Sequence, residues 1–214
     1  MLDFQQPYAR PRGEVDGWVA GDRGIGLAEV VARVHPTMLI GTSTHAGAFT
    51  EPIVREMAAH TERPIIMPLS NPTSKCEALP ADLISWTDGR VLTATGSPFG
   101  PVVYADRTYR IAQANNALVF PGLGLGVAVA KARRISDRMI AAAADAVARM
   151  SDAAALGASL LPSMDDLRAV SAAVGIAVAT TAVDQGLNRI KLPDPVQQIH
   201  QAMWRPEYPH LDFS

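Results

Sequence analysis

The chain has 214 residues, of which 48% are hydrophobic, and 19 Lys and Arg against 21 Asp and Glu give a formal net charge of −2. This composition is typical of one ordinary globular unit, and it excludes a disordered tail, a collagen and a histone-like polycation. Because the charge is near neutral and the basic residues are scattered, we expect no nucleic-acid partner.

The compartment follows from the cysteine count and from the start of the chain. A single cysteine, Cys76, cannot close an intramolecular disulfide. Residues 1–14 show neither the apolar core of a signal peptide nor a run long enough to span a bilayer. We therefore expect a cytoplasmic protein without a membrane partner.

Strands and helices alternate through the first half of the chain. Residues 1–23 have no apolar period, and we interpret them as a linker or the remnant of an upstream region. The elements predicted after it are a helix over 24–34, a strand over 38–40, a helix capped by Thr50, a strand over 64–69, a helix over 80–86, a strand over 91–95 and a hairpin-like excursion over 102–111. The strands are apolar throughout, which predicts an α/β fold with a parallel sheet buried on both faces.

The second half of the chain reads as helix. Residues 118–120 predict a last short strand, and the helices predicted after it cover 123–134, 138–150 and 164–185. Ser136 is the expected N-cap of the second of these helices. The end of the chain, 203–209, is a polar and aromatic tail that we expect to pack on a neighbour.

Small and polar residues follow each predicted strand. In an open parallel sheet, ligands bind outside the carboxyl ends of the strands. The residues at these ends are glycines, serines and asparagines: Gly41, Gly47, Gly96, Ser43, Ser70, Ser97, Asn71, Asn115 and Asn116. A neutral amide binds a carboxylate or a nicotinamide carbonyl without adding a charge that must be desolvated. The set suits a dinucleotide or a small acid, although each residue alone is more often a turn former or a helix cap.

Several chemical signatures are missing. The glycines in residues 21–26 (GDRGIG) have the wrong spacing for a G-x-G-x-x-G dinucleotide fingerprint and follow no predicted strand. His45, His60, His200 and His210 lie apart in the sequence and show no metal-ligand spacing. Cys76 has no partner arranged for a thiol nucleophile, so we expect it to be inert.

Five blocks of sequence stand in order along the chain. They are PTMLIGTS (36–43) with AFTEPIVREMA (48–58), RPIIMPLSNPTSK (63–75), ATGSPFGPV (94–102), QANNALVFPGLGLG (113–126) and RRISDRMI (133–140), followed by LLPS (160–163) and a WRPEYP tail (204–209). Together they closely resemble the C-terminal part of malic enzymes, and the resemblance covers nearly the whole chain.

Malic enzymes oxidise malate with NAD or NADP and decarboxylate the product to pyruvate, using Mg or Mn and a doubly wound, Rossmann-like dinucleotide domain. The resemblance implies the NAD-binding portion of an NAD-dependent malic enzyme, truncated at the N-terminus, with NADP as the alternative cofactor. Residues 24–135 would be the second half of the dinucleotide domain, and 136–214 the C-terminal helices and tail. It further implies malate as the substrate and a homo-oligomer for the intact enzyme.

The resemblance also assigns site residues. Asn71 and Asn115 are expected to bind malate. The residues expected to bind the cofactor are Thr42, Ser43, Ser70, Asn71 and Asn116. The catalytic Tyr and Lys and the acidic metal ligands of the family lie upstream of the matched blocks, so we expect no catalytic residue and no metal ligand here. The loop at residues 44–46 departs from the small, glycine-rich version common in the family.

Three functions stay open from the sequence. The leading hypothesis is a portion of a malic enzyme that supplies cofactor and substrate contacts and is inactive as an isolated chain. A malolactic enzyme shares the same architecture. A non-catalytic remnant or assembly partner is the alternative from another class, because the metal and acid-base residues are missing.

Overall fold

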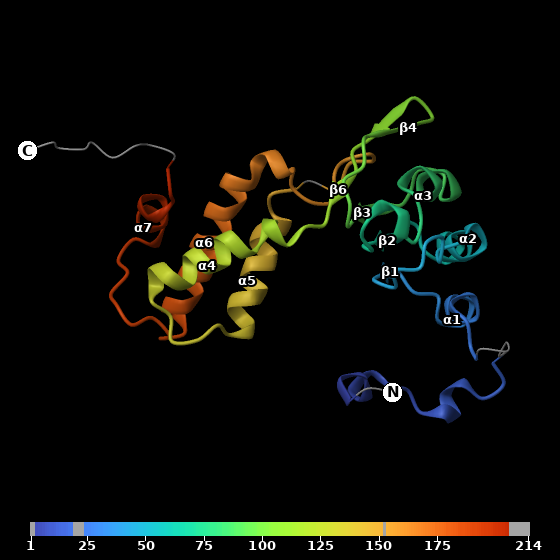
Figure 1. Ribbon diagram of the computed structural model, residues 1–214, viewed down its shortest axis with the longest axis horizontal. Helices are drawn as coiled ribbons and strands as arrows, with labels where there is room; N and C mark the ends of the chain where they lie inside the picture. The colour runs from blue at the N-terminus through green and yellow to red at the C-terminus, as the bar shows by residue number, and fades with distance from the viewer. Residues whose placement is uncertain (1–2, 19–23, 152, 206–214) are drawn as a thin grey trace, which may run out of the picture.

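The computed structural model describes residues 3–18, 24–151 and 153–205, and Figure 1 shows an α/β part and a helical part. Before them lie two short 3-10 helices, η1 (Asp3–Tyr8) and η2 (Arg12–Val15), in which no residue is buried. Residues 19–23 of the predicted linker and 206–214 of the predicted tail fall outside the described ranges. The interpretation of 1–23 as a linker stays a prediction.

The α/β part is a four-stranded sheet with three helices on one side of it (Figure 1). Its elements are α1 (Leu27–Val34), β1 (Met38–Gly41), α2 (Glu51–His60), β2 (Ile65–Pro68), η3 (Thr73–Lys75), α3 (Pro80–Trp86), β3 (Leu92–Thr95) and β6 (Ala112–Gln113). The strand order is β1-β2-β3-β6, and every neighbouring pair is parallel. The predicted α/β fold with a parallel sheet is confirmed.

One hydrophobic core, which we call the sheet core, lies between the sheet and the three helices. Its buried residues include Val31, Ile53, Val54, Met57, Ile66, Leu83, Ile84 and Val91. Leu39 of β1 packs against this core, whereas its neighbours Met38 and Ile40 are 48% and 53% exposed. Since successive side chains of a strand point to opposite faces, one face of β1 is uncovered. The prediction of a sheet buried on both faces is wrong for this strand, because the helices cover one side.

The hairpin-like excursion is a true hairpin. Strands β4 (Val102–Tyr104) and β5 (Arg107–Tyr109) pair antiparallel. Both residues of the connecting turn, Ala105 and Asp106, have positive φ, as a two-residue hairpin turn of type I′ requires. Tyr109 is buried in the sheet core and so anchors the hairpin to the α/β part.

The helical part holds a second hydrophobic core, which we call the helical core. Its helices are η4 (Asn116–Leu118), α4 (Phe120–Ala130), α5 (Asp137–Ala148), η5 (Met164–Asp166), α6 (Leu167–Asp184) and α7 (Pro195–Ala202). The predicted cap of α5 is confirmed, since Ser136 Oγ accepts from the backbone N–H of Met139 at 3.2 Å. Helix α7 was not predicted from the sequence.

The predicted strand over 118–120 is wrong. Asn115 Oδ1 accepts from the backbone N–H of Ala117 at 2.9 Å and starts the 3-10 turn η4, and α4 follows at once with Pro121 in its first turn. Proline at this position is preorganised for a helix. The strand that completes the sheet is β6, which the sequence analysis did not predict.

Helices α4 and α6 approach each other closely. An added Cβ at Gly122 would lie 2.6 Å from the Ser171 carbonyl oxygen, and one at Gly126 would lie 2.6 Å from the Gly175 carbonyl oxygen. The segment Met164–Asp184 is long and apolar enough to cross a membrane by length and composition alone. Its central position in the helical core explains this apolar character.

A segment after α5 returns to the α/β part before α6 begins (Figure 1). Arg63 donates to the carbonyl oxygens of Ala153 and Ala154 at 2.9 and 3.1 Å, and the Arg110 N–H donates to the Gly157 carbonyl at 3.0 Å. These contacts fasten residues 153–157 to the α/β part.

Candidate functional site

The residues that follow the four parallel strands meet at one edge of the sheet, which we call the carboxyl edge. It consists of the loops 42–49 after β1, 69–77 after β2, 96–101 after β3 and 114–116 after β6. The first two loops are joined by backbone hydrogen bonds, from the Gly47 N–H to the Cys76 carbonyl and from the Phe49 N–H to the Glu77 carbonyl. This is the edge where open parallel sheets bind ligands.

A buried carboxylate, Glu77, organises the first two loops. Its side chain is 0% exposed. Oε1 accepts from the Ser43 N–H at 2.8 Å, from Ser43 Oγ at 2.9 Å and from Ser70 Oγ at 2.5 Å, and Oε2 accepts from the Ser70 N–H at 3.3 Å. Burial alone raises the pKa of the Glu77 carboxyl, but the hydrogen bonds from Ser70 and Ser43 outweigh burial and leave the pKa lowered. Glu77 is therefore an ionised, fully bonded carboxylate.

Gly41 makes room for this carboxylate. A Cβ on Gly41 would lie 2.6 Å from the Glu77 Cδ. A Cβ on Gly96 would collide with the Leu69 carbonyl oxygen. From the sequence both glycines belong to the set at the strand ends that suits a ligand, but in the structure they make room for protein atoms instead.

Ser43 and Ser70, expected to bind the cofactor, both donate their hydroxyls to Glu77. The Ser70 Oγ also accepts from the Thr44 N–H at 2.8 Å. Their main role in the structure is thus to hold the loops around the carboxylate. Thr42, the first residue after β1, is exposed at the same edge.

The three asparagines also lie at the carboxyl edge. Asn71 Oδ1 accepts from Ser97 Oγ at 2.5 Å, beside the cis peptide bond to Pro72. Asn115 uses its Oδ1 to cap η4, and Asn116 next to it is exposed. Within the described residues, none of the three side-chain NH₂ groups has a protein acceptor, so all three are available as neutral donors to a ligand.

Glu77 was not predicted as a site residue from the sequence. The available signal was a single charged residue inside the otherwise uncharged run Cys76–Leu79. Cys76 itself is buried, and its Sγ donates to the Ala78 carbonyl oxygen at 3.0 Å. Burial raises the pKa of the Cys76 thiol, which keeps it protonated and agrees with the expectation that it is inert.

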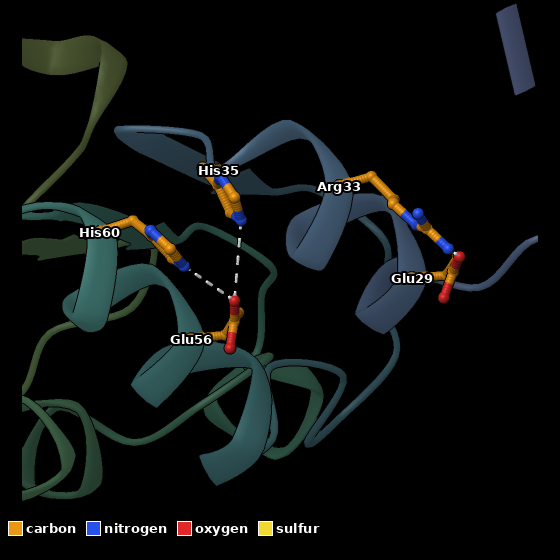
Figure 2. A network of polar contacts seen from close by, with 5 residues as sticks. All are labelled: Glu29, Arg33, His35, Glu56 and His60. Carbon is orange, nitrogen blue, oxygen red and sulfur yellow. Dashed lines mark hydrogen bonds and ion pairs between the residues drawn. The ribbon is translucent and has the colours of Figure 1, made fainter. Parts of the chain in front are cut away.

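The expectation that His60 stands alone is wrong. Its Nε2 lies 3.1 Å from Glu56 Oε1, and its ring stacks on that of His35 (Figure 2). His35 and His60 precede β1 and β2, so this group lies at the opposite edge of the sheet. Among the residues described at the carboxyl edge, no three His, Cys, Asp or Glu donors come close enough to share a metal ion.

A cavity of about 790 Å³ opens beside β6, between the hairpin, the end of β3 and the segment that returns before α6. Its lining includes Phe99, Arg110 and Gln113 from the α/β part and Ser159 and Asp165 from the returning segment. Gln113 Nε2 donates to the Gly96 carbonyl oxygen at 3.2 Å, which connects the cavity wall to the third loop of the carboxyl edge.

Comparison with known proteins gives consistent matches. A family model described as "Malic enzyme, NAD binding domain" matches residues 1–183. The chain is 54% identical to NAD-dependent malic enzyme 3 of Bacillus subtilis over 97% of its own length and 37% of that protein. The crystal structure of the Entamoeba histolytica malic enzyme matches with a TM-score of 0.65 at 26% identity, covering 82% of this chain and 32% of that one. The malic enzyme of Pyrococcus horikoshii matches with a TM-score of 0.64 at 27% identity, covering 94% and 41%.

Proposed function

Because the chain belongs to the malic enzyme family, we propose that it provides the NAD and malate contacts of an NAD-dependent malic enzyme, which converts malate to pyruvate and carbon dioxide. It spans 37% of the length of the Bacillus subtilis relative, so the complete reaction is proposed for the whole protein and not for this chain alone. The observation that carries the proposal is the group of three asparagine side chains at the carboxyl edge of a parallel sheet that matches the NAD-binding model of the family.

The asparagines fit malate and NAD because their side-chain NH₂ groups are neutral hydrogen-bond donors. When bound, NAD accepts a hydride from the C2 carbon of malate. We propose that the NH₂ groups of Asn71 and Asn115 donate to the malate carboxylate and that Asn71 and Asn116 contact the cofactor. Hydrogen bonds to a carboxylate are charge-assisted, and neutral donors make them without placing a second ion in the site.

Glu77 has a positioning role in this proposal. Its hydrogen bonds to Ser43 and Ser70 hold the loop 42–49 against the loop 69–77, which contains Asn71. A donor that is held in place before the ligand arrives loses less entropy on binding. Thr42, Ser43 and Ser70 then form the wall along which the cofactor lies.

The described carboxyl edge does not fit Mg²⁺ or Mn²⁺. These ions take several oxygen ligands. The buried carboxylate at this edge, Glu77, already accepts four hydrogen bonds from Ser43 and Ser70. We therefore propose that the chain binds NAD but does not oxidise malate by itself. We also propose, from the resemblance to malic enzymes, that the whole protein is a cytoplasmic homo-oligomer.

The proposal is tested by titrating the untagged chain with NAD and following binding by calorimetry. The decisive variant is Asn115→Asp, which keeps the oxygen that caps η4 and removes the NH₂ donor. We expect it to weaken malate binding, titrated at saturating NAD, by at least about tenfold, because one hydrogen bond is lost and a negative charge is placed beside the malate carboxylate. Gln201→Glu in α7 introduces the same charge on an exposed side chain far along the chain and serves as the control. Absence of NAD binding by the parent chain, or equal malate binding by Asn115→Asp and the parent chain at saturating NAD, would show the proposal to be wrong.

Turnover is checked separately. The chain is mixed with malate, Mn²⁺ and NAD, and the absorbance of the reduced cofactor is followed. We expect no increase over a blank without protein. Metal-dependent formation of reduced cofactor would contradict the proposed division of roles, whereas NAD binding without turnover agrees with it.

A further inference from the structure

Three potential metal ligands meet at the edge of the sheet opposite the carboxyl edge. Glu56 Oε1 lies 3.1 Å from His60 Nε2 and 3.8 Å from His35 Nε2. The ligand atoms of all three residues lie within 4.8 Å of one another. Figure 2 shows both imidazoles directing their Nε2 atoms at the same carboxylate oxygen.

The local backbone explains why the three side chains meet. Glu56 and His60 are four residues apart on α2, so they share one face of that helix. His35 follows the last residue of α1 and takes a left-handed conformation, with φ of 47°, which ends the helix and turns the chain toward β1. The two rings stack with their centroids 3.6 Å apart and their planes 19° from parallel.

The surroundings favour a cation. His35 is the C-cap of α1, so the negative end of that helix dipole lies at the site, whereas the end of α2 already accepts hydrogen bonds from Arg90 at the Ala58 and Thr61 carbonyl oxygens. The nearest basic residue in Figure 2, Arg33, is bonded to Glu29 at 3.0 Å and turned away from the imidazoles. The side chains of His35, Glu56 and His60 are 43%, 39% and 42% exposed, which leaves the donors accessible to an ion.

We propose that His35, Glu56 and His60 form a binding site for a divalent transition-metal ion of the zinc class. Two imidazole nitrogens and one carboxylate oxygen are a ligand set that zinc accepts in tetrahedral geometry, with water in the fourth position. Tetrahedral zinc keeps its donors about 3.3 Å apart and binds each imidazole nitrogen in the ring plane. Because the two rings are stacked 19° from parallel, at least one of these partly exposed rings must rotate out of the stack for both to bind one ion. Hard cations such as Mg²⁺ prefer oxygen ligands and do not suit this set.

The bound ion would tie the end of α1 to the end of α2. These two helices cover one face of the sheet at β1, where the sheet ends. A ligand that binds only the folded chain raises its stability. The site is thus a structural tie and stands apart from the NAD and malate contacts at the other edge of the sheet.

The experiment is a zinc titration of the untagged, metal-stripped chain by calorimetry, with Mg²⁺ as the second ion. We expect one zinc ion per chain and no Mg²⁺ binding. His60→Ala and Glu56→Gln should each weaken zinc binding by about a hundredfold, since even the loss of an outer-shell partner costs ten- to a hundredfold. His200→Ala removes an exposed histidine from α7 and should leave the affinity unchanged.

Stability gives an independent readout. At a zinc concentration about a hundredfold above the dissociation constant, the melting temperature should rise by about 5 to 10 °C for the parent chain and for His200→Ala. For His60→Ala, whose affinity is about a hundredfold lower, it should rise by only about 1 °C, and the circular dichroism spectrum without metal verifies that the variant folds. Zinc binding of equal affinity in His60→Ala and the parent chain, or no zinc binding by either, would overturn the proposal.

Discussion

At the scale of single residues, the candidate site depends on Glu77, whose buried carboxylate joins two loops through Ser43 and Ser70. Ser43, Ser70 and Asn71 are recognisable in the sequence because each follows an apolar strand. Glu77 and His35 are not, because their importance depends on side chains 34 and 25 residues away, Ser43 and His60. A buried carboxylate or a stacked imidazole pair is a product of tertiary contacts, which no local spacing encodes.

The first prediction concerns the charge of Glu77. In Glu77→Gln one carboxylate oxygen becomes an NH₂ group that faces either the Ser43 or the Ser70 backbone N–H, both of which are donors. Leaving one buried donor without an acceptor should lower the free energy of unfolding by about 1 to 3 kcal/mol. Urea unfolding followed by circular dichroism measures this, with exposed Glu62→Gln as the control. Equal unfolding midpoints for the two variants would contradict the prediction.

The second prediction is a pH dependence. The pKa of Glu77 is lowered in the folded chain, whereas an unfolded Glu titrates near about 4.3. The stabilisation from the carboxylate is therefore fully present above the unfolded value and is lost as the pH falls through the folded pKa. The difference in unfolding free energy between the parent chain and Glu77→Gln should shrink as the pH is lowered below about 4.3. A difference that stays constant from pH 7 to 3.5 would show that charge is not its cause.

At the scale of elements, long apolar helices and strands were predictable and their junctions were not. The helix over 80–86 agrees with α3 at both ends. The run 118–120 is short and apolar, so its side chains do not distinguish a strand from the start of a helix. A helix forms here because Asn115 caps the 3-10 turn η4 and Pro121 lies in the first turn of α4.

The third prediction uses the glycines of α4. Gly126→Ala would place a Cβ 2.6 Å from the Gly175 carbonyl oxygen, so the two helices must separate, at a cost of about 1 to 3 kcal/mol. Gly124, on the exposed side of the same helix, has open space around its added Cβ. Gly124→Ala should stabilise by about 0.5 to 1 kcal/mol, because alanine loses less backbone entropy in a helix. Thermal unfolding of both variants should therefore shift in opposite directions, and shifts of the same sign would contradict the packing described.

At the scale of the whole molecule, the sheet ends at β1 with an uncovered apolar face. Met38 and Ile40 are about half exposed there, and β1 pairs with β2 alone in the four-stranded sheet. An exposed apolar edge strand is a template for pairing with another chain.

The fourth prediction is that the exposed edge strand β1 drives self-association of the chain. At concentrations on the order of tens of micromolar, sedimentation should show species larger than the 22.7 kDa monomer. Ile40→Lys should reduce them, since charged edge residues oppose strand pairing. Ile140→Lys on α5 changes a side chain that is 52% exposed, against 53% for Ile40, and should leave association unchanged. A monomeric parent chain would contradict the prediction.

The returning segment has a mechanical consequence. Within the described ranges the backbone leaves the α/β part after β6, comes back to it at residues 153–157, where Arg63 binds it, and leaves again before α6. The chain therefore passes between the α/β part and the helical part several times. Several connections restrain twisting of one part against the other more than a single linker would, so bending about these connections is the easiest relative motion. The 790 Å³ cavity lies beside these connections and has walls from the α/β part, from the returning segment fastened to it, and from η5 of the helical part. Bending therefore changes the width of this cavity. A molecule that fills the cavity would fix the angle between the α/β part and the helical part.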